Sequence, residues 1–492
     1  MKKKKDRFNG YSAEVRELVL AFEEMLRKGE RNYMDEDQLE VVIDYYLEIN
    51  NVDMLSKSVR FAERLFPSNS EIRLRRSHLL CAQGRFDEAL PILRDLERQE
   101  PSNTDVAYAL GALYSAIDDH ARSIRYYKQA ATDGYELGTV YGNIGDEYVA
   151  LDHLKEAVVY YKRALAISSK ETRSMYNLVQ TLEQMDQMKE LVAYFDKYIH
   201  DHPYSKEAWL CLAYGHHNIQ ELDEAEDCCQ YALAIDDTFF DAYQELSDVR
   251  RDQGRIEEAV SALHQSFDYA PLPQDIYHQI ANLYMDYRDN FTTAIVYLKK
   301  ALDLDNENAF AWYDLALCYL RQANPFVGES PIGWSIEVDE TQSTADYQPA
   351  LNAISKALQL NPQSPDFLVL ASTIASLMGD FEQAETLCRY AVDLEDYDVK
   401  YWASLASLLM FCLQQWDKAI DVMREGLTKC DDPMPLQPLL AICYYMTGRR
   451  NFLFNALSAT VHNCPEMVSM MLEACPEMQF DYDVMNIINA TE

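Results

Sequence analysis

The stretch TVYGNIGDEYVALDHLKEAVVYYKRALAI, Thr139 to Ile167, decides the fold. In its first half, Tyr141, Ile144, Gly145 and Tyr148 follow the i, i+3, i+4, i+7 spacing of one helical face. The tyrosines and the isoleucine make this face apolar, and the glycine makes it locally flat. Its second half repeats this logic with Leu154, Ala157, Tyr161 and Ala164. The patterns meet near Asp152, so the stretch predicts two amphipathic helices joined by a tight turn. We expect the helices to cross closely at Gly145 and Ala157, with tyrosines filling the space beside them.

The pattern of this stretch returns every 34 residues along most of the chain. In this register, repeats begin at Glu36, Ser70, Thr104, Gly138, Thr172, Lys206, Phe240, Gln274, Ala309, Pro365, Val399 and Met434, with one inserted residue near Asn290. The eighth residue of each repeat is Gly, Ala or Ser, except for Ile43 and Val179. Twelve helix–turn–helix repeats in one register predict an all-α solenoid, because such a chain grows by stacking repeats.

A helix–turn–helix period of this length, with small residues where its helices cross, resembles the tetratricopeptide repeat over about residues 36 to 465. The resemblance implies an all-α, right-handed α-solenoid (superhelix) of about twelve such repeats, with the first helix of each repeat lining the concave side. We expect an N-terminal tail and cap helix over 1–35 and the solenoid over 36–465. A C-terminal cap helix and tail should follow over 466–492.

The fifth repeat departs from the pattern because three positions that should be small hold Val179, Leu191 and Tyr198. Bulky side chains at a helix crossing push the helices apart. Two interpretations remain open for this repeat. It is either a diverged repeat with compensating changes nearby, or a site where the superhelix kinks.

The ninth repeat is interrupted between its two helices by an insert at 324–348 that carries acids but no Lys or Arg. A loop of this length is uncommon unless it is functional or disordered. Disorder would not require large apolar residues. Phe326 and Trp334 therefore favour an insert that packs onto the solenoid.

Composition limits the function classes. The chain has 44 Lys and Arg against 81 Asp and Glu, a net charge of −37, which argues against nucleic acid as a partner. Its eleven cysteines form no CxxC pair, which favours a reduced, cytoplasmic setting. No apolar run is long enough for membrane insertion. Catalytic motifs, phosphate loops and clustered metal ligands are absent from the sequence, so we expect no enzyme activity, no cofactor and no metal.

A superhelix offers a binding surface, and the groove positions of repeats four to nine carry mostly amides, tyrosines and acids. This expected partner-binding set is Asn143, Asp146, Tyr176, Asn177, Gln180, Glu183, Tyr214, His217, Gln244, Asp248, Arg251, His278, Asn282, Tyr313 and Asp314, with Trp334 from the insert. Such side chains can bind the backbone of an extended peptide. Between Lys206 and Glu258 there are 14 acids and 4 bases, which favours a basic or neutral protein segment as the partner.

The sequence therefore predicts a non-catalytic protein–protein interaction adaptor or scaffold. Two alternatives remain open. The first is a structural component that self-associates through apolar groove residues of the C-terminal repeats, namely Val369, Leu370, Ala403, Met410, Phe411, Ile442 and Tyr445. The second is a regulatory subunit of an enzyme that binds a small ligand in the groove.

Overall fold

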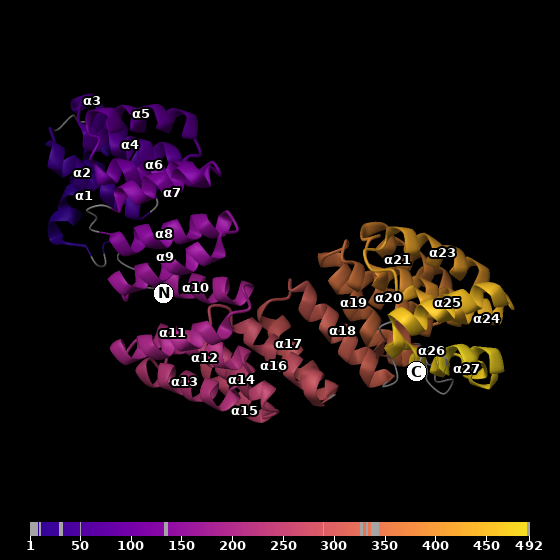
Figure 1. Cartoon of the computed structure of the whole chain (residues 1–492). Helices are drawn as coiled ribbons and strands as arrows, with labels where there is room; N and C mark the ends of the chain where they lie inside the picture. Colours follow the sequence, from indigo (N-terminus) through magenta and orange to yellow (C-terminus); the bar gives the residue numbers. More distant parts are fainter. Residues whose placement is uncertain are drawn as a thin grey trace. The chain divides into compact units, whose positions relative to one another are not determined.

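The computed structural model describes residues 8, 11–28, 33–49, 51–131, 136–288, 290–324, 328–330, 333–335 and 344–489, with the backbone alone for 288, 328–330, 333–335, 344 and 345. These residues form two compact units, Met1–Asp237 and Thr238–Glu492, called the N-terminal and C-terminal units below. The predicted all-α solenoid is confirmed, since helix–turn–helix repeats account for nearly all of both units (Figure 1).

In the N-terminal unit a single helix, α1 (Ala13–Lys28), precedes six helix pairs (Figure 1). The pairs are α2 (Glu36–Glu48) with α3 (Val52–Leu65), α4 (Ser70–Ala82) with α5 (Phe86–Gln99), α6 (Thr104–Ala116) with α7 (His120–Ala130), α8 (Leu137–Ala150) with α9 (Leu154–Ile167), α10 (Thr172–Gln184) with α11 (Met188–Asp201), and α12 (Lys206–Asn218) with α13 (Leu222–Ile235). Helix α1 buries Val19, Phe22 and Met25 and packs against α2.

The C-terminal unit has six further pairs. They are α14 (Phe240–Asp252) with α15 (Ile256–Ser266), α16 (Pro273–Arg288) with α17 (Phe291–Leu304), α18 (Ala309–Ala323) with α19 (Gln348–Leu360), α20 (Pro365–Leu377) with α21 (Phe381–Leu394), α22 (Val399–Ser407) with α23 (Trp416–Lys429), and α24 (Leu436–Met446) with α25 (Arg450–Asn463). A π-helical turn, Leu408–Cys412, extends α22. Helices α26 (Val468–Ala474) and α27 (Tyr482–Asn489) follow, packed on α24 and α25. Nine of the twelve expected repeat starts coincide with the first residue of a helix, so the register was right.

The turn between the helices of a repeat depends on one residue in the left-handed region. Asp152 has φ +59°, and Asp118, Asp186 and Gln220 have the same conformation at the same place in their repeats. After Asp152, the amide of His153 donates to the carbonyl of Tyr148 at 2.8 Å, which closes the end of α8 as in a Schellman motif. The turn predicted near Asp152 is therefore confirmed, and Asp is among the few non-glycine residues that adopt this conformation at modest cost.

The close helix crossing is also confirmed. A Cβ placed on Gly145 would lie 2.5 Å from Cε1 of Tyr161, and Ala157 is completely buried. Gly111 and Tyr127 repeat the arrangement in the preceding repeat, with a distance of 2.7 Å from the added Cβ to Cδ1. The third and fourth repeats therefore close by packing a tyrosine ring of the second helix on a glycine of the first.

The fifth repeat opens between its own helices. The backbones of α10 and α11 approach each other much less than those of α8 and α9 or of α12 and α13 do. Leu191 and Tyr198 are buried, and the Leu191 side chain reaches Gly215 of the next repeat, where an added Cβ would lie 3.3 Å from its Cδ2. The bulky residues thus separate the two helices, and a glycine of the next repeat accommodates one of them.

The insert contains a small antiparallel hairpin, β1 (Gly328–Ser330) with β2 (Gly333–Ser335), which places Glu329 opposite Trp334. The backbone of β2 lies against α22, and the short 3₁₀ helix η2 (Thr344–Tyr347) lies against α18 and α20. Phe326 and the Trp334 side chain lie outside the described residues.

The prediction of an exposed apolar surface on the C-terminal repeats was wrong. The five residues Val369, Leu370, Ala403, Met410 and Ile442 are at most 2% exposed, Tyr445 is partly buried, and only Phe411 is exposed. Three contacts account for this, because η2 packs on α20, β2 on α22 and α26 on α24. Self-association through these buried residues therefore lacks a surface to act on.

Candidate functional site

The first helices of neighbouring repeats contact one another directly at α2–α4, α4–α6, α8–α10 and α10–α12 in the N-terminal unit. In the C-terminal unit they do so at α18–α20, α20–α22 and α22–α24. We call the face that these helices present the first-helix surface. The expected binding residues divide between the units. Those from Asn143 to His217 lie on α8, α10 and α12, and those from Gln244 to Asp314 lie on α14, α16 and α18.

In the N-terminal unit, Asn143 links three repeats. Its Nδ2 donates to the hydroxyl of Tyr108 on α6 at 3.1 Å, and its Oδ1 accepts a hydrogen bond from the Arg173 guanidinium on α10. The Arg173 side chain is 53% exposed and also lies 3.3 Å from a carboxylate oxygen of Asp146. These contacts form a polar ladder across α6, α8 and α10.

Asp146 is the centre of this ladder. One of its oxygens accepts from the Tyr161 hydroxyl at 2.8 Å and from Nδ2 of Asn177 at 2.7 Å. Burial and the Asp146 carboxylate raise the pKa of Tyr161, so the phenol stays protonated and donates. The amide of Asn177 therefore joins α10 to α8.

The remaining expected residues of the N-terminal unit lie further along α10 and α12. Gln180 is exposed, and Tyr176 and His217 are partly buried. The hydroxyl of Tyr214 donates to Glu183 at 2.5 Å, which joins α12 to α10. The first-helix surface of this unit is thus crossed by hydrogen bonds at each step from α6 to α12.

In the C-terminal unit the expected residues form separate groups. Arg251 lies 2.5 Å from an Asp248 oxygen and 3.0 Å from an Asp252 oxygen. His278 Nε2 lies 2.5 Å from Asp314 Oδ2, which joins α16 to α18. The buried Nε2 of Gln244 has no hydrogen-bond partner among the described residues.

Two further expected residues of this unit, Asn282 and Tyr313, are partly buried. The ring of Tyr313 stacks on the buried Phe367 of α20 with ring centres 5.0 Å apart. Partial desolvation and the Asp314 carboxylate raise the pKa of Asp286, while Arg251 lowers it. A second carboxylate therefore lies close to the His278–Asp314 pair on this surface.

Residues missed by the sequence analysis include Tyr108, Arg173 and Asp286. Arg173 lies three residues before Tyr176, a member of the expected binding set, on the same predicted helix, so its place in the register could have identified it. The partners of Arg173 could not have been identified in the same way, since they lie about one repeat away.

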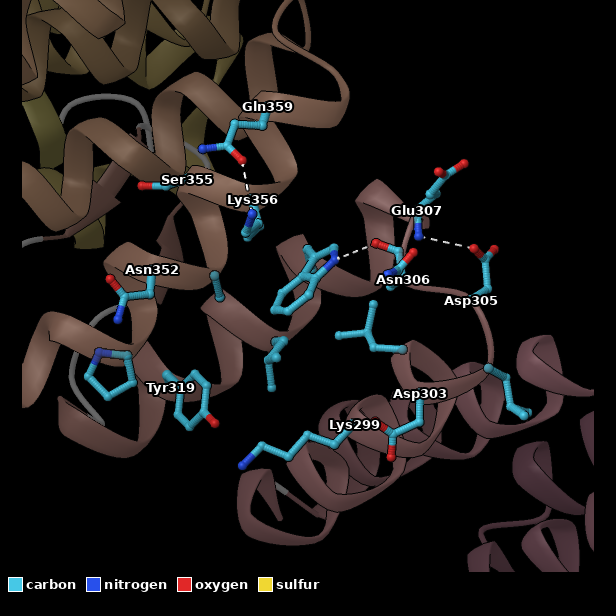
Figure 2. A pocket seen from close by; sticks show the side chains of 16 residues that line it. Lys299, Asp303, Asp305, Asn306, Glu307, Tyr319, Asn352, Ser355, Lys356 and Gln359 are labelled. Atoms are coloured by element: carbon cyan, nitrogen blue, oxygen red, sulfur yellow. Dashed lines mark hydrogen bonds between the residues drawn. The ribbon is translucent and has the colours of Figure 1, made fainter.

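A second candidate site is a cleft of about 1240 Å³ in the C-terminal unit, between α17, α18 and α19. Figure 2 shows Asp303, Asp305 and Glu307 on one side of the cleft and Asn352, Ser355, Lys356 and Gln359 on the other. Leu302, Leu304, Trp312, Leu315 and Ala353 supply apolar lining between them. The sequence analysis did not single out this cleft.

Neither site resembles a metal centre. Among the described residues, no three His, Cys, Asp or Glu side chains lie together so that they could hold a metal ion. In the same part of the chain, no helix is long and apolar enough to cross a membrane.

The repeats match models of a known family. Two models described as "Tetratricopeptide repeat" match the chain, one at residues 74–136 and the other at 138–171 and 274–308. The chain carries tetratricopeptide repeats at these residues. Repeats of this kind are modules of protein–protein interaction.

Solved structures with similar folds include other proteins of this type. A tetratricopeptide repeat protein from Parabacteroides merdae ATCC 43184 is 16% identical, with 55% of this chain and 98% of that chain covered and a TM-score of 0.40. The Cut9–Hcn1 hetero-tetramer of the APC/C is 13% identical, with 89% and 97% covered and a TM-score of 0.36. YrrB, "a TPR protein with an unusual peptide-binding site", is 16% identical, with 43% and 96% covered and a TM-score of 0.30. No curated protein matches the chain.

Proposed function

We propose that this protein is a non-catalytic, cytoplasmic adaptor or scaffold that binds an extended segment of another protein on its first-helix surface. The segment is basic or neutral, because acids greatly outnumber bases in the chain. Complementary charge raises the encounter rate and the selectivity of such an association, and the effect weakens with salt.

The observation that carries this proposal is the polar ladder of the N-terminal unit. The amide of Asn143, the carboxylate of Asp146 and the guanidinium of Arg173 are held by hydrogen bonds between repeats. Side chains that are already fixed lose less conformational freedom when a ligand binds. Arg173 is 53% exposed and Asp146 34% exposed, so groups fixed by the ladder still face solvent.

The ladder also suggests how a segment would be bound. A peptide backbone presents alternating N–H and C=O groups, and amide side chains can satisfy both kinds. Arg173 can donate to a backbone carbonyl, and Gln180, exposed one turn beyond Asn177, extends the polar face along α10. The tyrosines at 176 and 214 add ring surface beside these groups, which suits a segment of mixed polarity.

The test begins with affinity capture of the natural partner and mapping of its bound segment to a synthetic peptide. Binding of this peptide is then measured for the wild type and for Arg173→Ala and Asn177→Ala. We expect both variants to bind at least about tenfold more weakly, as for residues at the centre of an interface. Gln230→Ala is the matched control, since Gln230 is an exposed amide with one carboxylate partner on the second helix α13.

Stability must be followed in the same variants because Asn177 bonds to Asp146. Loss of one partly exposed hydrogen bond costs about 0.5–1.5 kcal/mol, which leaves the repeats folded. Asp248→Asn should chiefly reduce the salt dependence of binding. Asp146→Asn is less informative, since it also breaks the ladder. Equal affinity of the wild type, Arg173→Ala and Asn177→Ala would refute binding at this surface of the N-terminal unit.

A further inference from the structure

The cleft between α17, α18 and α19 has an apolar floor that the described residues leave uncovered. Leu304, the last residue of α17, is 56% exposed within it. The indole N–H of Trp312 donates to the carbonyl of Asn306 at 3.0 Å. This polar group is therefore satisfied, and the face of the indole is left for apolar contact. Leu302 and Leu315 are nearly buried beneath it.

The other tryptophans at this place in a repeat are covered. Trp209, the fourth residue of its repeat, stacks on Tyr231 of α13 with ring centres 4.6 Å apart. Trp402 of α22 is 3% exposed and packs against Gly426 of α23. In the described part of the chain, no aromatic ring stacks on Trp312.

The register explains the difference. Ala225 of α13 and Ala350 of α19 are the buried alanines at the same position of the second helix in their repeats. Six residues further along, α13 has Tyr231 and α19 has Lys356. Lys356 lines the cleft and its ammonium donates to Gln359 at 3.2 Å. A lysine thus replaces the ring that would have closed the cleft.

Charge is distributed unevenly around this floor. Asp303, Asp305 and Glu307 line the end where α17 terminates, and none of them forms an ion pair with any described residue. The carboxyl end of a helix also carries partial negative charge, which adds to the field of these acids. Lys299, one turn before Asp303 on α17, lies 5.6 Å from the ring centre of Tyr319. A cation is therefore favoured at the acidic end, beside the apolar floor.

We propose that this cleft binds a segment of a partner protein that seats a large apolar side chain on Trp312 and Leu304 and places a neighbouring Lys or Arg against Asp303, Asp305 and Glu307. The volume of about 1240 Å³ exceeds the usual range for small-molecule pockets, which favours a polypeptide. The walls are the second helices α17 and α19, so this site is distinct from the first-helix surface.

The probe is a panel of short synthetic peptides with Phe, Leu or Trp at the centre and Lys, Glu or Ser on one flank, followed by fluorescence anisotropy on the full chain. We expect the Lys-flanked peptides to bind and the Glu-flanked peptides to bind much more weakly. Asp303→Asn combined with Glu307→Gln should reduce both the affinity for Lys-flanked peptides and its salt dependence.

Lys356→Tyr tests the floor directly, because it restores the ring that covers Trp209. We expect it to lower the affinity at least about tenfold. Lys356→Gln is the matched control, because it removes the same charge without covering the indole of Trp312. This variant should bind the Lys-flanked peptides at least as tightly as the wild type does. Leu304→Lys is a second blocking variant at an exposed position, where the substitution does not disturb the core.

Equal binding by the wild type, Lys356→Tyr and Leu304→Lys would overturn the proposal, as would a panel in which no peptide binds. Binding that is lost in Asn177→Ala but kept in Lys356→Tyr would place the peptides on the first-helix surface, overturning the cleft and leaving the proposed function intact. Binding of free tryptophan amide with no binding of any peptide would assign the cleft to a small molecule and also overturn the proposal.

Discussion

Gly145→Ala tests whether the seat of Tyr161 on α8 fixes the geometry of a repeat. The added Cβ would lie 2.5 Å from Cε1 and 2.7 Å from Cδ1 of the ring. Carbon atoms are in favourable contact at about 3.5–4.0 Å, so the ring must move by about 1 Å. Tyr161 is 1% exposed and its hydroxyl bonds to Asp146, so the ring has little freedom to yield.

The expected magnitude is the difference between two effects. Overpacking typically costs about 1–3 kcal/mol, and the rigid ring favours the upper part of that range. Replacing a mid-helix glycine by alanine contributes about 1 kcal/mol in the opposite sense. The net loss in unfolding free energy should therefore be about 1–2 kcal/mol, and Gly145→Leu should cost more.

Gly142→Ala is the matched control on the same helix. Its added Cβ would lie 2.7 Å from the hydroxyl oxygen of Ser174, the end of a small side chain that has no hydrogen-bond partner among the described residues. This hydroxyl can rotate away, so the helix gains about 1 kcal/mol with little steric cost. Gly142→Ala should be neutral or stabilising.

The measurement is urea unfolding by circular dichroism, with hydrogen exchange of the α8 and α9 amides, because repeats unfold in local groups. Tyr161→Leu should remove the steric penalty, so that Gly145→Ala in that background stabilises by up to about 1 kcal/mol and the two changes couple by about 2–3 kcal/mol. Equal stabilities of Gly145→Ala and Gly142→Ala would refute the reasoning. Loss of protection throughout the chain would contradict the nearest-neighbour description.

Three further predictions concern a buried hydroxyl, a buried thiol and the insert. Tyr198→Phe should leave the unfolding free energy unchanged or raise it by up to about 1 kcal/mol, since the buried hydroxyl has no partner among the described residues. A decrease of more than about 1 kcal/mol in urea unfolding would show that the hydroxyl has a hydrogen-bond partner. Burial raises the pKa of the Cys318 thiol to about 12, so maleimide should label this thiol only after unfolding. Because the unfolded thiol ionises more readily than the folded one, the free energy of unfolding should be unaffected by this group below the ordinary thiol pKa of 9.0 and should decrease as the pH rises above it. Limited proteolysis should not cut first within 324–348 if the insert packs through Phe326 and Trp334; rapid cleavage confined to that segment would contradict this.

The period, the helix bounds and the crossings could be predicted from sequence because local interactions determine them. The i, i+3, i+4 spacing of Tyr141, Ile144 and Gly145 requires an apolar helical face. Gly145 also leaves space for a ring of the next helix. Asp152 marks the turn because few side chains tolerate the left-handed conformation there. Each of these features lies within one repeat, and the repetition confirms it many times along the chain.

The partners of the surface residues were decided only by the tertiary structure. Asn177 reaches Asp146 across about one repeat, and such a contact depends on the angle and separation between helices that sequence spacing does not give. The fate of apolar residues such as Val369 depends on which segment covers them, here η2 against α20. The exposure of Trp312 likewise depends on a side chain from another helix. Periodicity determines which face of a helix is apolar, whereas the packing of neighbouring elements determines whether that face is buried or left open to a partner.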